Sequence, residues 1–164
     1  MEHLDWVSVA ADIKNRYNEF RRRAVLDVIL TAPELAHLAT FSAAILAPVN
    51  ALESAGKVWG STGTGLCQGD PMSGMLQAIG MQPTLVELDE ECAQGGGVAR
   101  EGADDVFALG PPEVALPAMA RFAADLRRLC GLDFQWAKIM INMRQETGHH
   151  HHMPWKALVW LGRR

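Results

Sequence analysis

The spacing of apolar residues predicts alternating strands and helices in the first half of the chain. Apolar and β-branched residues in Trp6–Ala11 predict a buried strand that ends at Asp12. Phe20–Leu30 carries apolar residues at helical spacing, and Glu34–Leu46 continues as a second helical segment. Lys57–Trp59 fits a short strand. The first half therefore predicts one strand, two helices and a further short strand.

The second half begins with a glycine-rich loop, Gly60–Asp70, whose backbone can approach a ligand closely. Pro71 suits the first turn of a helix, which we expect to be kinked at Pro83 and to continue toward Glu91. A strand, a turn and a second strand are predicted across Val98–Leu109. This part of the chain thus predicts a long helix followed by a hairpin.

A last amphipathic helix around Met119–Leu129 and a strand over Leu132–Ile141 complete the predicted order β-α-α-(β)-α-β-β-α-β. This order is typical of an α+β fold, an antiparallel sheet with helices on one face, of the ferredoxin-like type. We expect one domain over residues 1–141 and a poorly ordered C-terminal tail over residues 142–164. The tail contains the histidine run His149–His152, which is typical of a disordered low-complexity tract, with loose metal binding or a truncated purification tag as alternatives.

Length and composition are those of an ordinary globular protein. The chain has 164 residues, of which 49% are hydrophobic and 21% charged, which suits one domain with a single core. No apolar run approaches the roughly 20 residues that span a bilayer, and the N-terminus does not resemble a secretory signal. Three separated cysteines without a CxxC pair favour reduced thiols. We expect an intracellular protein, cytoplasmic or nuclear, without a membrane partner.

The net charge of −4 has the wrong sign for a domain that binds nucleic acid by its overall field. One local basic patch exists in the segment KNRYNEFRRR, around two aromatic residues. A solvated first helical turn and a nucleic-acid contact are both consistent with it. The basic side chains of this patch are Lys14, Arg16, Arg21, Arg22 and Arg23.

Three aspartates suggest a metal site. Asp12 follows a predicted strand, and Asp104 and Asp105 occupy the turn of a predicted hairpin. If these strands are neighbours, the carboxylates converge at one end of the sheet and offer the hard oxygen ligands that suit Mg²⁺. Two such ions about 3.5–4 Å apart can hold the attacking and leaving oxygens of a phosphoryl transfer. The alternative is structural: a tight Asp-Asp turn, and Asp12 as a helix N-cap.

Four segments in order, over roughly residues 6–141, resemble the reverse transcriptase family, and most of all the palm of the non-LTR retroelement and group II intron type. They are ADIKNRYNEF, with Asp12 and Tyr17, GLCQGDPMSGM, with Gln68 and Gly69, GADDVFALG, with Asp104 and Asp105, and GLDFQWAK, with Lys138. The resemblance implies a polymerase palm that performs two-metal nucleotidyl transfer as an RNA-directed DNA polymerase. Its partners would be an RNA template, a DNA primer and dNTPs.

The resemblance also implies roles for individual residues. Asp12 and Asp104 would hold two Mg²⁺ (or Mn²⁺) ions, with Asp105 beside them, so we expect the first two carboxylates to share a cation. Tyr17 would exclude a 2′-hydroxyl from the incoming nucleotide, and Lys138 would protonate or pair with the departing pyrophosphate, with an ordinary surface lysine as the alternative. Gln68 and Gly69 would contact the nucleotide and the template.

Two positions depart from the family pattern. Gly102 stands where the family has an aromatic residue before Ala-Asp-Asp, and Arg16 stands where a small residue is usual. We also find no fingers region before Glu2 and no thumb after Ile141. A catalytically silent palm remnant, acting at most as a nucleic-acid or protein interaction module, is therefore the alternative function, and a ferredoxin-like binding domain unrelated to polymerases is a third. We expect the isolated chain to extend primers weakly or not at all.

Overall fold

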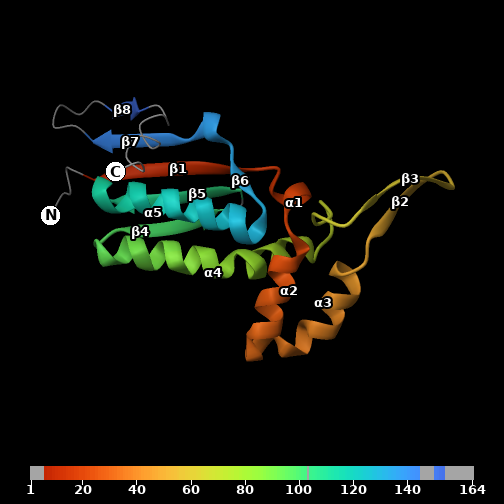
Figure 1. The fold of residues 1–164 in the computed structure, drawn as a ribbon. Helices are drawn as coiled ribbons and strands as arrows, with labels where there is room; N and C mark the ends of the chain where they lie inside the picture. The colour runs from red at the N-terminus through yellow and green to blue at the C-terminus, as the bar shows by residue number, and fades with distance from the viewer. Residues whose placement is uncertain (1–5, 103, 145–149, 154–164) are drawn as a thin grey trace. The chain divides into compact units, whose positions relative to one another are not determined.

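The structure, a computed structural model, describes residues 6–102, 104–144 and 150–153 of the chain (Figure 1). Its strands are β1 Val7–Lys14, β2 Asn50–Ser54, β3 Lys57–Thr62, β4 Val98–Gly102, β5 Asp105–Gly110, β6 Asp133–Phe134, β7 Met140–Arg144 and β8 His150–Met153. Its helices are α1 Arg16–Glu19, α2 Arg22–Thr31, α3 Ala39–Leu46, α4 Ser73–Gln94 and α5 Pro112–Asp125. Shorter segments are the 3₁₀ helices η1 Pro33–Leu38 and η3 Trp136–Lys138 and the π-helical η2 Leu126–Cys130.

Two compact units share the chain, and each combines segments that are distant in the sequence. The sheet unit comprises Met1–Lys14, Thr84–Arg127 and Asp133–Arg164. The helix-hairpin unit comprises Asn15–Pro83 and Arg128–Leu132. The predicted catalytic aspartates and Lys138 belong to the first unit, and Tyr17, Gln68 and Gly69 belong to the second.

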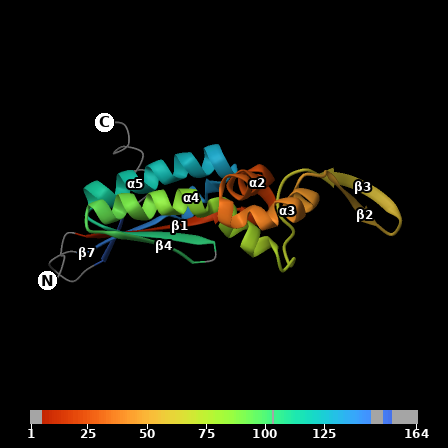
Figure 2. The same ribbon diagram turned by 90° about the horizontal axis from the view of Figure 1, so that it is seen from below.

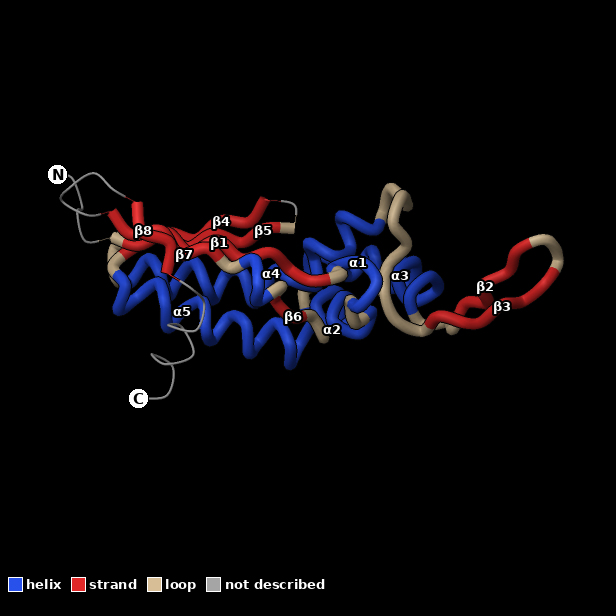
Figure 3. The backbone as a smooth tube through the Cα atoms, turned by 90° about the horizontal axis from the view of Figure 1, so that it is seen from above, coloured by secondary structure: helices blue, strands red, loops and turns tan. Residues whose placement is uncertain are grey.

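The sheet unit contains a six-stranded antiparallel sheet in the order β4-β5-β1-β7-β8, and β6 pairs with the end of β1. In Figures 2 and 3, α5 and α4 lie on one face of this sheet. The predicted α+β class, an antiparallel sheet with helices on one face, is confirmed.

The central strand β1 explains why one face of the sheet is covered. Its residues Val7, Val9 and Ile13 are almost completely buried, because alternate side chains of a strand point to the same face. On β5, Val106 and Ala108 are likewise buried, while the residues between them are exposed. α5 supplies the opposing apolar surface with the side chains of Ala115, Leu116, Ala118, Met119, Phe122 and Ala123.

The helix-hairpin unit has its own core, centred on Phe20. Phe20 is fully buried and packs against α4 at Gly80, where a Cβ atom would lie 2.7 Å from the ring atom Cζ. The β2–β3 hairpin belongs to this unit and forms a separate two-stranded sheet. Further core residues are Val25, Ile29, Leu46, Leu66, Leu76, Met81, Cys130 and Leu132.

Several element boundaries differ from the prediction. β1 does not end at Asp12 but continues to Lys14, because Ile13 is buried and pairs with Phe134 of β6. The predicted last strand is divided into β6 and β7 by the turn η3. The segment expected to be a glycine-rich loop contributes its first residues, as far as Thr62, to β3.

The predicted end of the domain at residue 141 falls within a strand. β7 continues to Arg144, and His150–Met153 forms β8, which pairs with β7. The other tail residues, 145–149 and 154–164, lie outside the described residues. The expectation of a poorly ordered tail stays a prediction.

The close approach of Gly80 to Phe20 makes a stability prediction. Gly80→Ala should lower the free energy of unfolding by about 1–3 kcal/mol, because the new Cβ atom would also lie 3.1 Å from Val25 Cγ2 and overpack the core. Gly74→Ala in the same helix is the matched control, since its Cβ atom would meet only Tyr17 Oη at 3.8 Å. The control should be neutral or stabilising by up to about 1 kcal/mol, from helix propensity. Urea unfolding that shows the same change in both variants would contradict this packing.

Candidate active site

Asp12 and Asp105 occupy directly paired positions of two neighbouring strands. β1 and β5 are antiparallel with Asp12 opposite Asp105, and the Ile13 N–H donates a 2.9 Å hydrogen bond to the Asp104 carbonyl. The pair next to a hydrogen-bonded pair is the closer, non-hydrogen-bonded kind, with Cα atoms about 4.5 Å apart. Side chains of paired residues lie on the same face of a sheet. The two carboxylates therefore meet on the face of the sheet opposite the helices.

Lys138 completes a charged cluster with these two residues. Its Nζ donates a 2.5 Å hydrogen bond to Asp12 Oδ2 in an ion pair. The hydrogen bond with Asp12 and the charge of Asp12 raise the pKa of Lys138, and the charge of Asp105 raises it further. The ammonium group is therefore protonated at neutral pH. We call these three residues the Asp12–Asp105–Lys138 cluster.

Local structure places Lys138 beside Asp12. The Gln135 N–H donates to the Asp12 carbonyl at 2.7 Å, and the Lys138 N–H closes η3 on the Gln135 carbonyl at 2.8 Å. Before this turn, Asp133 Oδ1 accepts hydrogen bonds from the Phe134 N–H and from Trp136 Nε1. The sequence interpretation missed Asp133, although its i, i+3 spacing from Trp136 is a signal that could have identified it.

Aromatic packing fixes the same segment. The ring of Phe134 lies 5.9 Å from the ring of Phe122 on α5 and 5.8 Å from the ring of Trp136. Such pairs stabilise beyond their buried area by about 0.5–1.5 kcal/mol. A salt bridge from Arg127 to Asp133 also joins η2, which follows α5, to β6. η3 is thus held from both sides.

Asp104 lies in the turn before β5 and is exposed. Its backbone carbonyl accepts the hydrogen bond from the Ile13 N–H. The residue in register with Asp12 is Asp105, so the expected sharing of a cation by Asp12 and Asp104 stays a prediction. Within the part of the chain that the structure describes, no group of three or more His, Cys, Asp or Glu side chains is arranged to hold a metal ion.

The donor chemistry nevertheless fits a divalent cation. Mg²⁺ is commonly bound by one or two carboxylates together with substrate phosphates and waters, so Asp12 and Asp105 offer a sufficient protein contribution. The Asp12 carboxylate already holds one cation, the Lys138 ammonium group. A metal ion at this position would have to displace it.

The basic patch of the sequence is divided by the structure. Lys14 is exposed at the end of β1 in the sheet unit, whereas the arginines belong to the helix-hairpin unit. Arg16 is buried. Arg22 is buried as well, and it donates to the carbonyls of Gly65 at 2.8 Å and Pro48 at 2.9 Å. These contacts give Arg22 a structural role that its sequence context did not indicate.

The remaining arginines are exposed. Arg21 donates through Nη1 to the Arg128 carbonyl, and Arg23 forms a salt bridge with Asp27. A cavity of about 380 Å³ in this unit is lined by three consecutive arginines and five other residues, namely Arg21, Arg22, Arg23, Leu26, Leu46, Ala47, Gly63 and Thr64. Its charge and size are those of a surface that could receive a phosphate group.

Of the predicted nucleotide-binding residues, Tyr17 lies on α1, and Gln68 and Gly69 lie on the loop that follows β3. Tyr17 is half-buried, and its carbonyl accepts a 2.7 Å hydrogen bond from the Leu66 N–H. Gly65 has a positive φ of 76°, and a Cβ atom there would lie 2.5 Å from the Asn18 carbonyl oxygen, so only glycine fits. Gln68 is exposed and lines a cavity of about 250 Å³, together with Arg22. Gly69 also has a positive φ, with open space around it.

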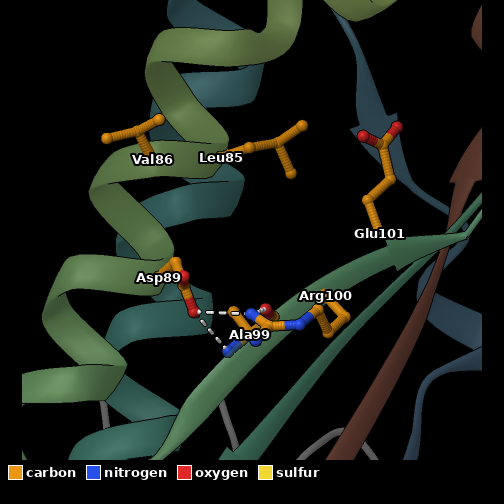
Figure 4. Close-up of a pocket in the computed structure, with 6 residues that line it drawn as sticks. All are labelled: Leu85, Val86, Asp89, Ala99, Arg100 and Glu101. Atoms are coloured by element: carbon orange, nitrogen blue, oxygen red, sulfur yellow. Dashed lines mark hydrogen bonds and ion pairs between the residues drawn. The ribbon is translucent and has the colours of Figure 1, made fainter.

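A third cavity, of about 200 Å³ in the sheet unit, contains none of the predicted site residues and lies between α4 and β4 (Figure 4). Asp89 accepts hydrogen bonds there from the Ala99 N–H at 2.9 Å and from Arg100 Nη1 at 3.2 Å. Because β4 is an edge strand, these contacts protect its exposed backbone from pairing with other chains.

Comparisons with known proteins show the fold. No family model matches this sequence, and no curated protein matches it. The structure is similar to the telomerase from Candida tropicalis in complex with a TWJ fragment of telomeric RNA, with a TM-score of 0.61 and 11% identity over 83% of this chain and 26% of that chain. It is also similar to apo telomerase from Candida tropicalis truncated from its C-terminal domain, with a TM-score of 0.56 and 11% identity over 90% of this chain and 35% of that chain.

The chain thus spans about a quarter and about a third of the two telomerase chains. At 11% identity the likeness shows the fold alone, an α+β fold like that of a polymerase palm. No described helix is long and apolar enough to cross a membrane.

The ion pair makes a prediction about proton binding. Asp12→Asn should lower the pKa of Lys138 toward its ordinary value, because the variant loses both the charged hydrogen bond and the charge, and Asp105→Asn should lower it less. Lys138 binds its proton more tightly in the folded chain than in the unfolded chain. The ion pair therefore stabilises the fold fully below the unfolded-state pKa of about 10.4, and this stabilisation is lost as the pH rises through the folded-state pKa. Titration of the lysine side chains by NMR measures both effects, with Lys57 as the internal control. If the pKa of Lys138 is the same in Asp12→Asn as in the wild type, the ion pair between Lys138 and Asp12 is contradicted.

Proposed function

We propose that this chain is the palm of an RNA-directed DNA polymerase of the non-LTR retroelement or group II intron type. The observation that carries the proposal is the Asp12–Asp105 pairing with Lys138 bound to Asp12. This arrangement offers two carboxylates and a charged ammonium group at one end of an antiparallel sheet. The order of the four sequence motifs and the reverse-transcriptase-like fold support it, with the polymerase portion over residues 1–141.

In this proposal the carboxylates of Asp12, Asp104 and Asp105 hold Mg²⁺ or Mn²⁺ together with the triphosphate of a dNTP. Two such ions, when bound, neutralise the phosphate charge and stabilise the attacking and leaving oxygens. The chain's own contribution is to orient these groups, since phosphoryl transfer depends on positioning and charge. β1 and β5 hold the aspartates in position, because the two strands pair without interruption from Val7 to Asp12.

Lys138 acts on the leaving group. The primer 3′-hydroxyl releases its proton to solvent, and its oxygen forms a bond to the α-phosphorus of the dNTP while the bond from that phosphorus to the pyrophosphate oxygen breaks. The Lys138 ammonium group, which is protonated at neutral pH and whose pKa is raised further by Asp12, donates a hydrogen bond or a proton to the pyrophosphate. For this step the Lys138 ammonium group would have to leave the Asp12 carboxylate, which is also one of the groups that would hold a metal ion.

Nucleic acid and nucleotide contacts are assigned to the helix-hairpin unit. This unit has six basic against five acidic residues, a net charge of +1, whereas the sheet unit has nine against fourteen, a net charge of −5. Tyr17, Gln68 and Gly69 take the nucleotide and the template base, and the exposed Arg21 and Arg23 contact phosphates. One of the similar telomerases is in complex with an RNA fragment, which supports an RNA partner.

The two departures from the family pattern have physical accounts that support an active site. Arg16 is buried, so its charge is withdrawn from the solvent-exposed surface. A Cβ atom on Gly102 would lie 4.0 Å from Cε2 of Phe107, so the Phe107 ring stands beside the position where the family carries its aromatic side chain. Phe107 can therefore brace the hairpin in place of the missing residue.

Metal-dependent stability tests the proposal. Mn²⁺ or Mg²⁺ should raise the Tm of the wild-type chain, because ions that bind only the folded state stabilise it by mass action. Asp12→Asn and Asp105→Asn should reduce the shift, whereas Asp27→Asn, the same substitution at an exposed ion pair with Arg23, should retain it. Lys138→Met should increase the shift, because it removes the ammonium group that competes for Asp12.

Thermal melts of the five proteins decide between the functions. A wild-type shift that disappears in Asp105→Asn supports the polymerase site. Equal Tm shifts in the wild type and in Asp105→Asn would show that the metal ion does not bind at the aspartates. No shift in any of them would favour the catalytically silent remnant.

A further inference from the structure

Helix α3 exposes large apolar side chains on one face and buries a serine beside a leucine on another. Of its eight residues, ATFSAAIL, only Ser42 and Leu46 are buried. Within the described residues the Ser42 hydroxyl has no hydrogen-bond partner, and burying such a group costs free energy. Phe41 and Ile45, one turn apart on the same helix face, are exposed, Phe41 to 46%. A helix of a globular protein normally has the opposite arrangement, so this face requires a partner.

The β2–β3 hairpin also lacks a covering surface. Its residues are exposed from Ala51 to Ser61, and Trp59 is 71% exposed, with the Lys57 ammonium group 5.1 Å from its ring centroid. Figure 1 shows the hairpin extending away from α2 and α3. In the described chain, β2 and β3 pair only with each other. An isolated two-stranded sheet is at best marginally stable in water, whereas three or more strands are stable.

Together these elements form one apolar set of side chains, which we call the hairpin surface. Its members are the exposed residues Leu30, Phe41, Ile45, Val49, Leu52, Val58 and Trp59. Their exposed fractions add up to about four whole side chains, an apolar area on the order of 600 Å². A standard protein interface buries roughly 800 Å² on each partner, so an interface of that size would have to use side chains of both α3 and the hairpin.

The charge pattern identifies the class of partner. The segment Leu35–Leu52 contains no Asp, Glu, Lys or Arg, and the hairpin adds one acidic and one basic residue, Glu53 and Lys57. Nucleic acid binding needs an excess of positive charge, so this neutral surface favours a protein partner. Its own charges cancel, so two such surfaces do not repel each other.

We propose that the hairpin surface joins two copies of this chain. The unpaired edge of β3 requires a strand, and a second copy offers the same edge with the same apolar, neutral flank. Antiparallel pairing of the two hairpins about a two-fold axis gives a four-stranded sheet and covers Trp59 and Val58. α3 of each copy then contributes Phe41 and Ile45 to the interface. This proposal does not rest on the proposed polymerase activity, although Leu52 also lines the cavity that contains Gln68.

Sedimentation velocity over a wide range of protein concentration tests the interface, under reducing conditions because Cys67 is exposed. The wild-type chain should pass from monomer to dimer as the concentration rises. Trp59→Ser should weaken self-association by roughly tenfold or more, as expected for an aromatic residue at an interface centre. Val86→Ser is the matched control, since Val86 is an exposed apolar residue of α4 outside the hairpin surface.

A second variant separates the strand pairing from the loss of apolar area. Val58→Pro removes one backbone N–H of β3 and should abolish the dimer, while the Tm at low protein concentration should stay close to that of the wild type because Val58 is exposed. A chain that is monomeric at every concentration overturns the proposal. So does a dimer that Trp59→Ser and Val58→Pro leave unchanged, or one that Val86→Ser weakens equally.

Discussion

The candidate site depends on the antiparallel register of β1 and β5, which sets one aspartate directly opposite another. Paired positions of a sheet bring like charges close together, and such pairs are destabilising unless a cation neutralises them. Here the cation is the Lys138 ammonium group, bound to Asp12 and influenced by Asp105. The apolar contacts on the other face of β1 and β5 hold the register against this repulsion. In the structure the Lys138 ammonium group accompanies this pair of aspartates.

This arrangement gives the Lys138 ammonium group a partner within the chain, the Asp12 carboxylate. In the proposed function, a divalent ion at Asp12 would release this ammonium group for another anion. The turn η3 that carries it is fixed by Asp133 and by the rings of Phe134 and Trp136, so only the flexible end of the side chain has to move.

Much of the fold could be predicted from the sequence, because the buried strands and helices carry clear periodic patterns. The alternation on β5 and the apolar stripe of α5 are such patterns. β5 lies where it was expected, whereas α5 overlaps the helix expected around Met119–Leu129 but begins at Pro112 and ends at Asp125, before the π-helical η2. The hairpin β2–β3 could not be delimited, since its exposed residues have no burial pattern to follow. The extension of β1 past Asp12 depends on pairing with Phe134, a contact 121 residues away that no local pattern encodes.

For the site, the residue types could be predicted but their pairing could not. The sequence indicated that Asp12 and the Asp-Asp turn would converge, yet it could not tell which of the two neighbours would lie opposite Asp12, because a shift of one residue changes the face. The arginines illustrate the same limit. Arg21, Arg22 and Arg23 are consecutive, but only the structure shows that Arg22 is buried on backbone carbonyls while its neighbours are exposed.

The central claim, nucleotidyl transfer at the Asp12–Asp105–Lys138 cluster, is tested most directly by primer extension. The chain would be joined to the fingers and thumb of a related polymerase and supplied with an RNA template, a DNA primer, dNTPs and Mg²⁺. The account predicts extension that Asp12→Asn and Asp105→Asn abolish and that Asp27→Asn leaves intact. Extension that survives Asp12→Asn, or a joined protein that binds the primer–template but never extends it, would contradict the account.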